Sequence, residues 1–229
     1  IGLIRSCFKE KFGVARQSLM VPEALGFLKL NPHPHYQQAI ADLEGFSHLW
    51  VLYIFHKNIK KGWRPVITPP RVDGPTRVGV FSSRSPHRPN PIGLSCLKLE
   101  SIDRRAKNGI EIHVSGLDIL DNSPLLDIKP YLPYTDSVPH AACGWAAGEI
   151  QKFPVTFSPK SLTIIENHGT IHHPRLKELL KQILELDPRP TSQRHLAPIH
   201  DRENEGRQFA FRLFDFDVRW EIREQGLFV

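Results

Sequence analysis

Short apolar segments, punctuated by Gly, Pro and Asn, follow one another over residues 1–155, and no amphipathic helix of three turns interrupts them. The segment FSHLWVLYIFH at 46–56 is almost unbroken in apolar character, which favours a strand buried on both faces. TRVGVFSSRS at 76–85 and IGLSCLKLESI at 92–102 also predict strands. In GIEIHVSGLDIL, at 109–120, the alternation slips at Gly116, which indicates a bulge or a strand end. Many short strands with long loops predict a closed or nearly closed β-barrel.

The pattern changes after Phe157, where apolar residues recur at helical spacing. The segments 158–169 and 173–188 predict two short helices, bounded by Pro and Gly. RQFAFRLFDFDVRWEI, at 207–222, alternates with a period of two and shifts phase once, which predicts a bend within a hairpin-forming segment. We therefore expect a mostly β protein with an N-terminal β-barrel domain, residues 1–155, and a small C-terminal α+β domain, residues 156–229.

Composition narrows the class of protein. Of the 229 residues 40% are hydrophobic, which argues against disorder, and no apolar run approaches the ~20 residues that span a bilayer. No segment resembles a signal peptide. Cys7, Cys96 and Cys143 form no C-x-x-C pair, which argues against a disulfide framework or structural zinc. We expect a globular protein of the reducing cytoplasm, without membrane association.

Several common sites are absent from the sequence. No P-loop, no G-x-G-x-x-G after a strand and no G-x-S-x-G elbow is found, so P-loop, Rossmann and α/β-hydrolase functions lack support. The pairs His33 with His35 and His172 with His173 do not place two imidazoles and a carboxylate on one helical face. We expect surface histidines there and no metal site.

Positive charge is concentrated in residues 57–88. The net charge of the chain is +6, and this stretch carries eight Lys and Arg residues against Asp73 alone, so the remainder is close to neutral. Trp63 and Phe81 lie among the basic residues. Basic and aromatic side chains on constrained loops are typical of proteins that bind single-stranded RNA, whereas a solvated basic face is the alternative. The candidate RNA contacts are Lys60, Lys61, Arg64, Arg71 and Arg77.

Two proline-rich segments are dense in functional side chains. RSPHRPNPIG, at 84–93, holds three prolines, and each fixes its own φ and restricts the preceding residue. This loop is either a rigid turn between strands or a preformed binding loop. LDILDNSPLLDIKPYLPY, at 117–134, combines carboxylates with a lysine and tyrosines. It forms either a salt-bridged turn or a site that binds a cation or handles a proton.

These segments resemble a known family when they are taken in order. IGLIRSCFKEKFGVARQ, GFSHLWVLYIFH, GWRPVITPPR, RVGVFSSRSPHRPNPIGLS, LDILDNSPLLDIKPYLPY, LDPRP and DFDVRW follow one another as in the TsaA/TrmO-like proteins. That family consists of S-adenosylmethionine-dependent tRNA methyltransferases that act on N6-threonylcarbamoyladenosine beside the anticodon. The resemblance extends over nearly the whole chain, and RPNPIG with DIKPY is its most specific part.

The resemblance implies a β-barrel methyltransferase that is a homodimer, binds S-adenosylmethionine and acts on tRNA. It also implies that the proline-rich loop helps to build a preformed cofactor site. By residue match, the cofactor-binding residues are Gln17, Ser18, Leu19, His56, Lys57, Arg84, Arg88, Asp121, Asn122, Ser123 and Pro124.

For catalysis, the segment DIKPY supplies the candidates. The acceptor nitrogen carries a carbamoyl group and is a poor nucleophile, so a base near its proton would help. Asp127 and Tyr131 are the candidate bases, and Lys129 is expected to bind the threonyl carboxylate or a phosphate. A non-catalytic module that binds the anticodon arm and a small-molecule hydrolase are the alternatives. Binding of S-adenosylmethionine separates them, since only the methyltransferase requires it.

Overall fold

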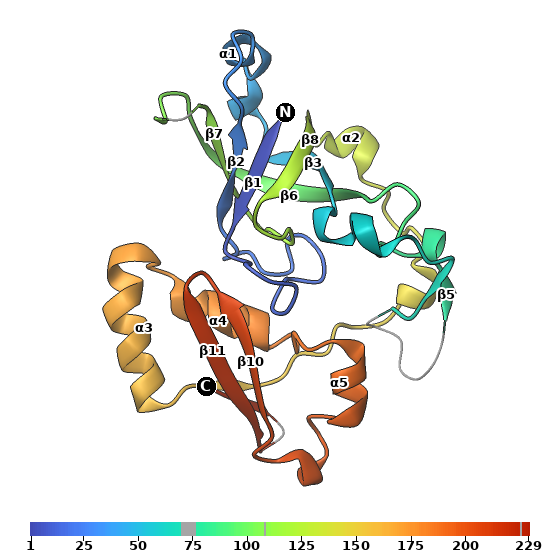
Figure 1. Ribbon diagram of the computed structural model, residues 1–229, viewed down its shortest axis with the longest axis vertical. Coiled ribbons are helices and arrows are strands. Elements are labelled where there is room, and N and C mark those ends of the chain that lie inside the picture. The colour runs from blue at the N-terminus through green and yellow to red at the C-terminus, as the bar shows by residue number, and fades with distance from the viewer. Residues whose placement is uncertain (70–76, 108, 225) are drawn as a thin grey trace.

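The N-terminal part of the chain is a closed antiparallel barrel (Figure 1). The computed structural model describes residues 1–69, 77–107, 109–224 and 226–229, with the backbone alone at 169–172. Around the barrel the strand order is β1-β2-β7-β6-β3-β8. The bounds are β1 (Gly2–Ser6), β2 (Gly26–Leu30), β3 (His48–Ile54), β6 (Ile92–Asp103), β7 (Glu111–Ser115) and β8 (Ser123–Pro130). The predicted β-barrel is confirmed, and β7 ends just before Gly116, where the pattern slipped.

Strand β3 lies between β6 and β8 and shows how the alternation fills the barrel. Leu49, Val51 and Tyr53 are buried in its interior, whereas Trp50 and Leu52 are half-buried on the outside. The expectation of a strand buried on both faces is therefore wrong. An apolar run is compatible with a strand buried on one face or on both, because the outward-facing side chains of this strand are also mostly apolar.

The connections of the barrel carry short helices and one minor ribbon. They are α1 (Tyr36–Ala39), η1 (Leu43–Gly45), η2 (His56–Lys61), β4 (Val66–Ile67), β5 (Val78–Gly79), η3 (Val80–Ser82), α2 (Pro133–Asp136) and η4 (Gly144–Ala146). The strand expected over 76–85 is wrong apart from β5. The chain turns into η3 instead, because the carbonyl of Val80 accepts hydrogen bonds from Ser83 and Arg88 rather than from a neighbouring strand.

The C-terminal unit is a four-stranded sheet with helices, in the order β10-β11-β12-β9. Its elements are β9 (Val155–Thr156), α3 (Pro159–His172), α4 (Leu176–Leu184), α5 (Thr191–Leu196), η5 (Arg202–Asn204), β10 (Gln208–Leu213), β11 (Phe216–Arg223) and β12 (Gly226–Phe228). The expected C-terminal α+β architecture is confirmed. The phase shift in the last segment is the hairpin turn itself, since Leu213 pairs with Phe216 and Phe214 has a φ of 50°.

The two units pack against each other through the loop that follows β1, drawn in dark blue in Figure 1. Phe8 forms an isolated antiparallel β-bridge with Leu213, and the amide of Phe214 donates a hydrogen bond of 2.9 Å to the carbonyl of Cys7. The buried side chains of both units form one continuous cluster. The division of the chain at residues 155 and 156 therefore stays a prediction. Among the described residues, none of the helices has the length and apolar character that crossing a bilayer requires.

Candidate active site

The proline-rich loop 84–93 is held by a dense set of local hydrogen bonds. Arg88 donates from Nη1 to the carbonyls of Ser83 at 2.6 Å and Val80 at 3.1 Å. The amide of His87 donates to Ser85 Oγ, and the carbonyl of His87 accepts from the amide of Arg64. The loop is therefore fixed both by its prolines and by these bonds. It presents Pro86 to a cavity at the end of the barrel.

That cavity, the barrel-end pocket, has a volume of about 210 Å³ and lies where β3 passes into η2. Four parts of the chain that are distant in sequence supply its walls. They are Lys11 and Val14 after β1, Tyr53, Phe55, His56, Lys57 and Asn58 at the end of β3, Pro86 in the proline-rich loop, and Asp118, Leu120 and Ser123 before and in β8. Of the predicted cofactor-binding residues, His56, Lys57 and Ser123 line this pocket.

Asp118 is the carboxylate of the barrel-end pocket. Its Oδ1 accepts a hydrogen bond of 2.6 Å from Ser95 Oγ, and its carboxylate also accepts from the backbone N–H of Ser18. Burial raises the pKa of Asp118 to about 6, although these bonds and the charge of Arg84 oppose the rise. A buried carboxylate with such a pKa is a candidate functional group.

Positive charge surrounds the mouth of the pocket. Lys11 Nζ donates to Asn58 Oδ1 at 2.6 Å, and burial followed by the charge of Lys61 lowers the pKa of Lys11. Burial and the nearby Lys57 also lower the pKa of His56, so its imidazole is neutral at pH 7. An anionic group bound here would offset the repulsion among these cations.

The predicted residues after EKFGVAR lie beside the pocket. Gln17 Oε1 accepts a hydrogen bond of 2.6 Å from Arg84 Nη1, which joins two of the predicted cofactor-binding residues. The backbone amide of Ser18 donates a hydrogen bond to the carboxylate of Asp118. Leu19 is exposed, has a φ of 64° and donates its amide to the carbonyl of Gly116. The structure thus brings this segment, Arg84 and Asp118 together.

In the DNSP turn, Ser123 is the residue that lines the pocket. Its hydroxyl lies 3.3 Å from His56 Nδ1. Asp121 is buried and accepts hydrogen bonds from the Ser6 amide and from Lys9 Nζ, both at 2.9 Å, so it ties the turn to β1. Asn122 accepts from Arg5 and adopts a φ of 61°. Pro124 pairs with Leu3 of β1. The contacts of these three residues hold the turn in place.

The predicted catalytic residues lie on the outside of the barrel. A register shift between Leu52 and Tyr53 leaves Leu126 unpaired in β8, so Asp127 and Lys129 face outward. They form an ion pair of 3.1 Å. The amide of Tyr131 donates to the carbonyl of His48, at the far end of β3 from the pocket. Within one chain, the structure does not bring these three residues to the barrel-end pocket.

The predicted RNA-contacting residues follow Lys57 along η2 and the loops after it. Lys60 and Lys61 are exposed at the end of η2, and Arg64 and Arg77 are exposed on the loops that follow. Arg71 lies outside the described residues. Trp63 and Phe81, with 52% and 75% of their surface exposed, stand on the same stretch. Among the described residues, no group of three or more His, Cys, Asp or Glu is placed to hold a metal ion.

Sequence reasoning did not place Lys11, Tyr53 or Asp118 in the pocket. Lys11 lies in IGLIRSCFKEKFGVARQ, and Asp118 is one of several carboxylates in LDILDNSPLLDIKPYLPY. The pattern slip at Gly116 was the signal for Asp118, since this glycine has a φ of 74° and ends the strand before the pocket. Lys11 had no such signal, because only barrel closure brings its loop to β3.

The closed antiparallel barrel joined to a C-terminal α+β unit places the chain in the β-barrel class of tRNA methyltransferases, because the chain superposes over its whole length on a crystal structure of TrmO with a TM-score of 0.78. Two family models match the chain. They are the tRNA-methyltransferase O N-terminal domain at residues 3–137 and the TrmO C-terminal domain at residues 150–229. The chain belongs to the tRNA-methyltransferase O family.

Similar proteins extend over nearly its full length. A tRNA (adenine(37)-N6)-methyltransferase of Escherichia coli strain K12 is 38% identical over 230 residues, which cover 99% of this chain and 93% of the relative. A putative S-adenosylmethionine-dependent methyltransferase of Pseudomonas aeruginosa is 39% identical, with the same coverage. The crystal structure of TrmO from Pseudomonas aeruginosa superposes with a TM-score of 0.79 at 36% identity, covering 100% of this chain and 93% of that one.

Proposed function

We propose that this protein transfers a methyl group from S-adenosylmethionine to N6 of adenosine 37 in tRNA, and that the adenosine carries a threonylcarbamoyl group. The full-length similarity to a tRNA (adenine(37)-N6)-methyltransferase carries the proposal. The threonylcarbamoyl group rests on the family resemblance.

The residues of the barrel-end pocket fit a cofactor that carries both signs of charge. Asp118 is buried and has no ion-pair partner within 4.0 Å among the described residues, so a cationic group beside it would replace the hydration that burial removes. Lys57 and Lys11 supply the opposite sign of charge and suit a carboxylate. We place S-adenosylmethionine against these residues, with Gln17, Ser18 and Arg84 at its side.

In this mechanism the chain mainly aligns two reactants, S-adenosylmethionine and the acceptor adenosine. When bound, the cofactor supplies an activated methyl group. The proline-rich loop and the clamped DNSP turn are rigid, so they hold the pocket in one shape before ligands bind. Such alignment can contribute ~7–11 kcal/mol to lowering a barrier. Neutral His56 adds no further positive charge to the pocket, which suits the binding of a cationic donor.

The candidate base belongs to a neighbouring chain in this proposal. Asp127 and Lys129 cannot reach the pocket of their own chain, because they lie on the outer face of β8. Tyr131, just after β8, lies beside His48 and Trp50 at the far end of β3. In a homodimer the three candidates would meet the pocket of the partner, where Asp127 or Tyr131 takes the proton of N6 and Lys129 binds a carboxylate or phosphate.

An exposed apolar strip supports the homodimer. Outside the barrel, Leu52 lies opposite Leu94 and Ile54 opposite Ile92. Leu94, Ile92 and Leu126 have 53%, 45% and 37% of their surface exposed. A contiguous strip of this kind is typical of an interface between subunits. It lies beside Asp127, so a second copy docked on it would be next to the candidate catalytic residues.

Sedimentation tests the homodimer. We expect the protein to sediment as a dimer, and Leu94→Asp to give a folded monomer without methyltransferase activity, because the charge would be buried in the interface. Ile164→Asp, at an exposed position of α3, is the control and should remain dimeric. A wild-type monomer that methylates tRNA would rule out the shared site.

Calorimetric titration with S-adenosylmethionine tests the activity at its first step. We expect one saturable site per chain, and weaker binding in Arg84→Ala, because Arg84 holds Gln17 and lies near Asp118. Arg219→Ala, an exposed arginine in β11, is the matched control. A pure, folded protein that binds no S-adenosylmethionine would leave the RNA-binding module as the better account.

A further inference from the structure

A second cavity, the interdomain cleft, lies between the loop after β1 and the C-terminal unit. It has a volume of about 290 Å³ and is lined by Phe12 and Gly13 on the barrel side. The C-terminal unit supplies Pro188, Arg189, Pro190, Gln193, Gln208, Phe209, Ala210, Phe211 and Trp220. The LDPRP and DFDVRW segments thus meet in this cleft. The cleft and the barrel-end pocket share no lining residue.

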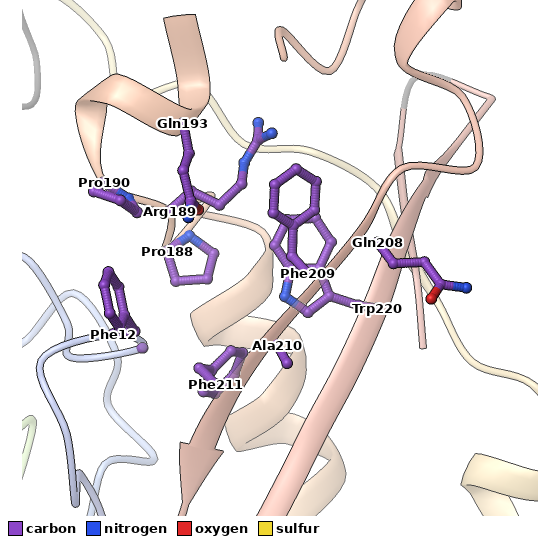
Figure 2. Close-up of a pocket in the computed structure, with 11 residues that line it drawn as sticks. Phe12, Pro188, Arg189, Pro190, Gln193, Gln208, Phe209, Ala210, Phe211 and Trp220 are labelled. Atoms are coloured by element: carbon purple, nitrogen blue, oxygen red, sulfur yellow. The ribbon is translucent and has the colours of Figure 1, made fainter. Parts of the chain in front are cut away.

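Aromatic rings form the two sides of the cleft. Figure 2 shows Phe12 on one side and the rings of Phe209 and Trp220 on the other, with Pro188 between them. Phe209 and Trp220 are stacked, with centroids 4.8 Å apart and planes inclined by 27°. Phe12 has 47% of its surface exposed. Trp220 has only 3% of its surface exposed, so it supports Phe209, and Phe12 is the ring that offers an exposed face to a flat aromatic ligand.

The polar groups of the cleft suit the edge of a nucleobase. Gln193 extends from α5 toward the cleft, whereas Gln208 turns away and donates to Glu221 (Figure 2). An amide both donates and accepts hydrogen bonds, as a base edge does. The guanidinium of Arg189 lies 4.7 Å from the centroid of Phe209, and its charge is paired with Asp187. Gln193 is therefore the polar group that we assign to the base edge.

The cleft is held open by fixed contacts. Arg189 donates from Nε and Nη2 to the two carboxylate oxygens of Asp187, each at 2.7 Å, and from Nη1 to the carbonyl of Ala197. Arg16, from the loop after β1, donates to the carbonyl of Asp187 and so joins the two walls. A preformed cleft loses less conformational entropy when a ligand binds.

The loop after β1 separates the cleft from the barrel-end pocket by a single layer of chain. Lys11 and Val14 line the pocket, while Phe12 and Gly13, between them in sequence, line the cleft. Consecutive Cα atoms are about 3.8 Å apart, so the two cavities lie on opposite sides of one short segment. An RNA loop with its acceptor nucleoside at the mouth of the pocket can therefore place a neighbouring base in the cleft.

We infer that the interdomain cleft binds an unstacked base of the tRNA anticodon loop against the exposed ring of Phe12. This rests on the proposed tRNA substrate and gives the C-terminal unit a direct part in holding it. Stacking on aromatic side chains is the usual way in which proteins hold splayed bases of single-stranded RNA.

The test uses an anticodon stem-loop in which 2-aminopurine replaces one loop base at a time, with the full-length protein. We expect the fluorescence of one loop position to rise on binding, because that base leaves the stack of its neighbours. Phe12→Leu should abolish that rise and weaken stem-loop binding at least fivefold, because leucine fills space without an aromatic face. Phe12→Tyr should retain both. Binding of S-adenosylmethionine should be equal in all three, since Phe12 does not line the barrel-end pocket.

Ile164→Ala is the matched control, because Ile164 is an exposed apolar residue on α3 with 43% of its surface exposed. Equal stem-loop affinity in Phe12→Leu and wild type would overturn the inference and leave the proposed function intact. Weaker binding of Phe12→Leu, with no rise at any position in the wild type, would also overturn it, since Phe12 would then act without holding an unstacked base. A wild-type protein that binds S-adenosylmethionine but no stem-loop would overturn the proposed tRNA substrate and, with it, this inference.

Discussion

At the scale of single residues, Asp118 sets the charge of the barrel-end pocket. Burial raises its pKa to about 6, so the carboxyl binds a proton more readily in the folded chain than in the unfolded one. Its contribution to stability is therefore fully present below its ordinary pKa near 3.8 and is lost as pH rises through about 6. The same ionisation gives the pocket the negative charge that a cationic ligand needs, which supports a functional role.

We predict that binding of S-adenosylmethionine strengthens as pH rises through about 6 and then becomes constant, because Asp118 gains its charge in that range. Asp118→Asn should weaken binding at pH 7.5 by about tenfold to a hundredfold, as the loss of a charged hydrogen-bond partner does. It should also remove the pH dependence. Calorimetric titration from pH 5 to 8 measures both effects. Asp217→Asn, at an exposed carboxylate of β11, is the control.

At the scale of secondary-structure elements, the sequence predicted local periodicity well and long-range contacts poorly. The two longer helices and the hairpin segment leave a pattern that burial imposes, whereas the unbroken apolar run of β3 predicted the wrong burial for that strand. Helix α5 leaves none, since it has six residues and buries no side chain. The residues of DIKPY are close in sequence, but an unpaired Leu126 turns Asp127 to the outside, and no pattern indicates on which side of a strand such a bulge falls.

The site was predictable where one segment supplies several residues. His56 and Lys57 follow an apolar strand, and the proline-rich loop is visible as a composition change. Lys11 and Asp118 reach the pocket from opposite ends of the barrel domain, and only closure of the barrel brings them together. Contacts of this kind depend on strand order, which a single sequence does not specify.

Helix η2 joins the pocket to the basic surface, and its lysines give a prediction at this scale. If Lys60 and Lys61 bind phosphates, their joint replacement by alanine should reduce the slope of log affinity for tRNA against log salt concentration by about 1 for each lysine that neutralises a phosphate. Lys177 and Lys181, exposed on α4, provide a matched double replacement that should keep the slope of the wild type. Filter binding at several salt concentrations measures the slopes, and an unchanged slope in the η2 variant would place the phosphate-binding residues elsewhere.

At the scale of the whole molecule, the loop after β1 couples the barrel to the C-terminal unit. It lines the barrel-end pocket on one side and packs on the hairpin of β10 and β11 on the other. Glu10 accepts a hydrogen bond of 2.8 Å from the amide of Arg212. Gly13 lies against Phe211 so closely that a Cβ there would collide with the ring. The C-terminal unit therefore supports the loop that forms one wall of the pocket.

Two glycines test this coupling. Gly13 and Gly206 have nearly equal φ angles, 84° and 80°, but a Cβ on Gly206 would meet no atom within 4 Å. Both alanine variants should lose about 1–3 kcal/mol of unfolding free energy to backbone strain. Gly13→Ala should lose a further ~1–3 kcal/mol, because the added methyl overpacks the contact with Phe211. Urea denaturation measures the difference, and equal losses would mean that the loop yields to the methyl at no cost.

Nucleoside mass spectrometry identifies the product of the proposed reaction. Purified protein is incubated with S-adenosylmethionine and tRNA that contains threonylcarbamoyladenosine at position 37, and the digested nucleosides are compared with those of a reaction without protein. We expect threonylcarbamoyladenosine to gain one methyl group at N6, and Asp118→Asn to slow this gain. A folded protein that binds both ligands but leaves that nucleoside unmethylated would contradict the proposed reaction.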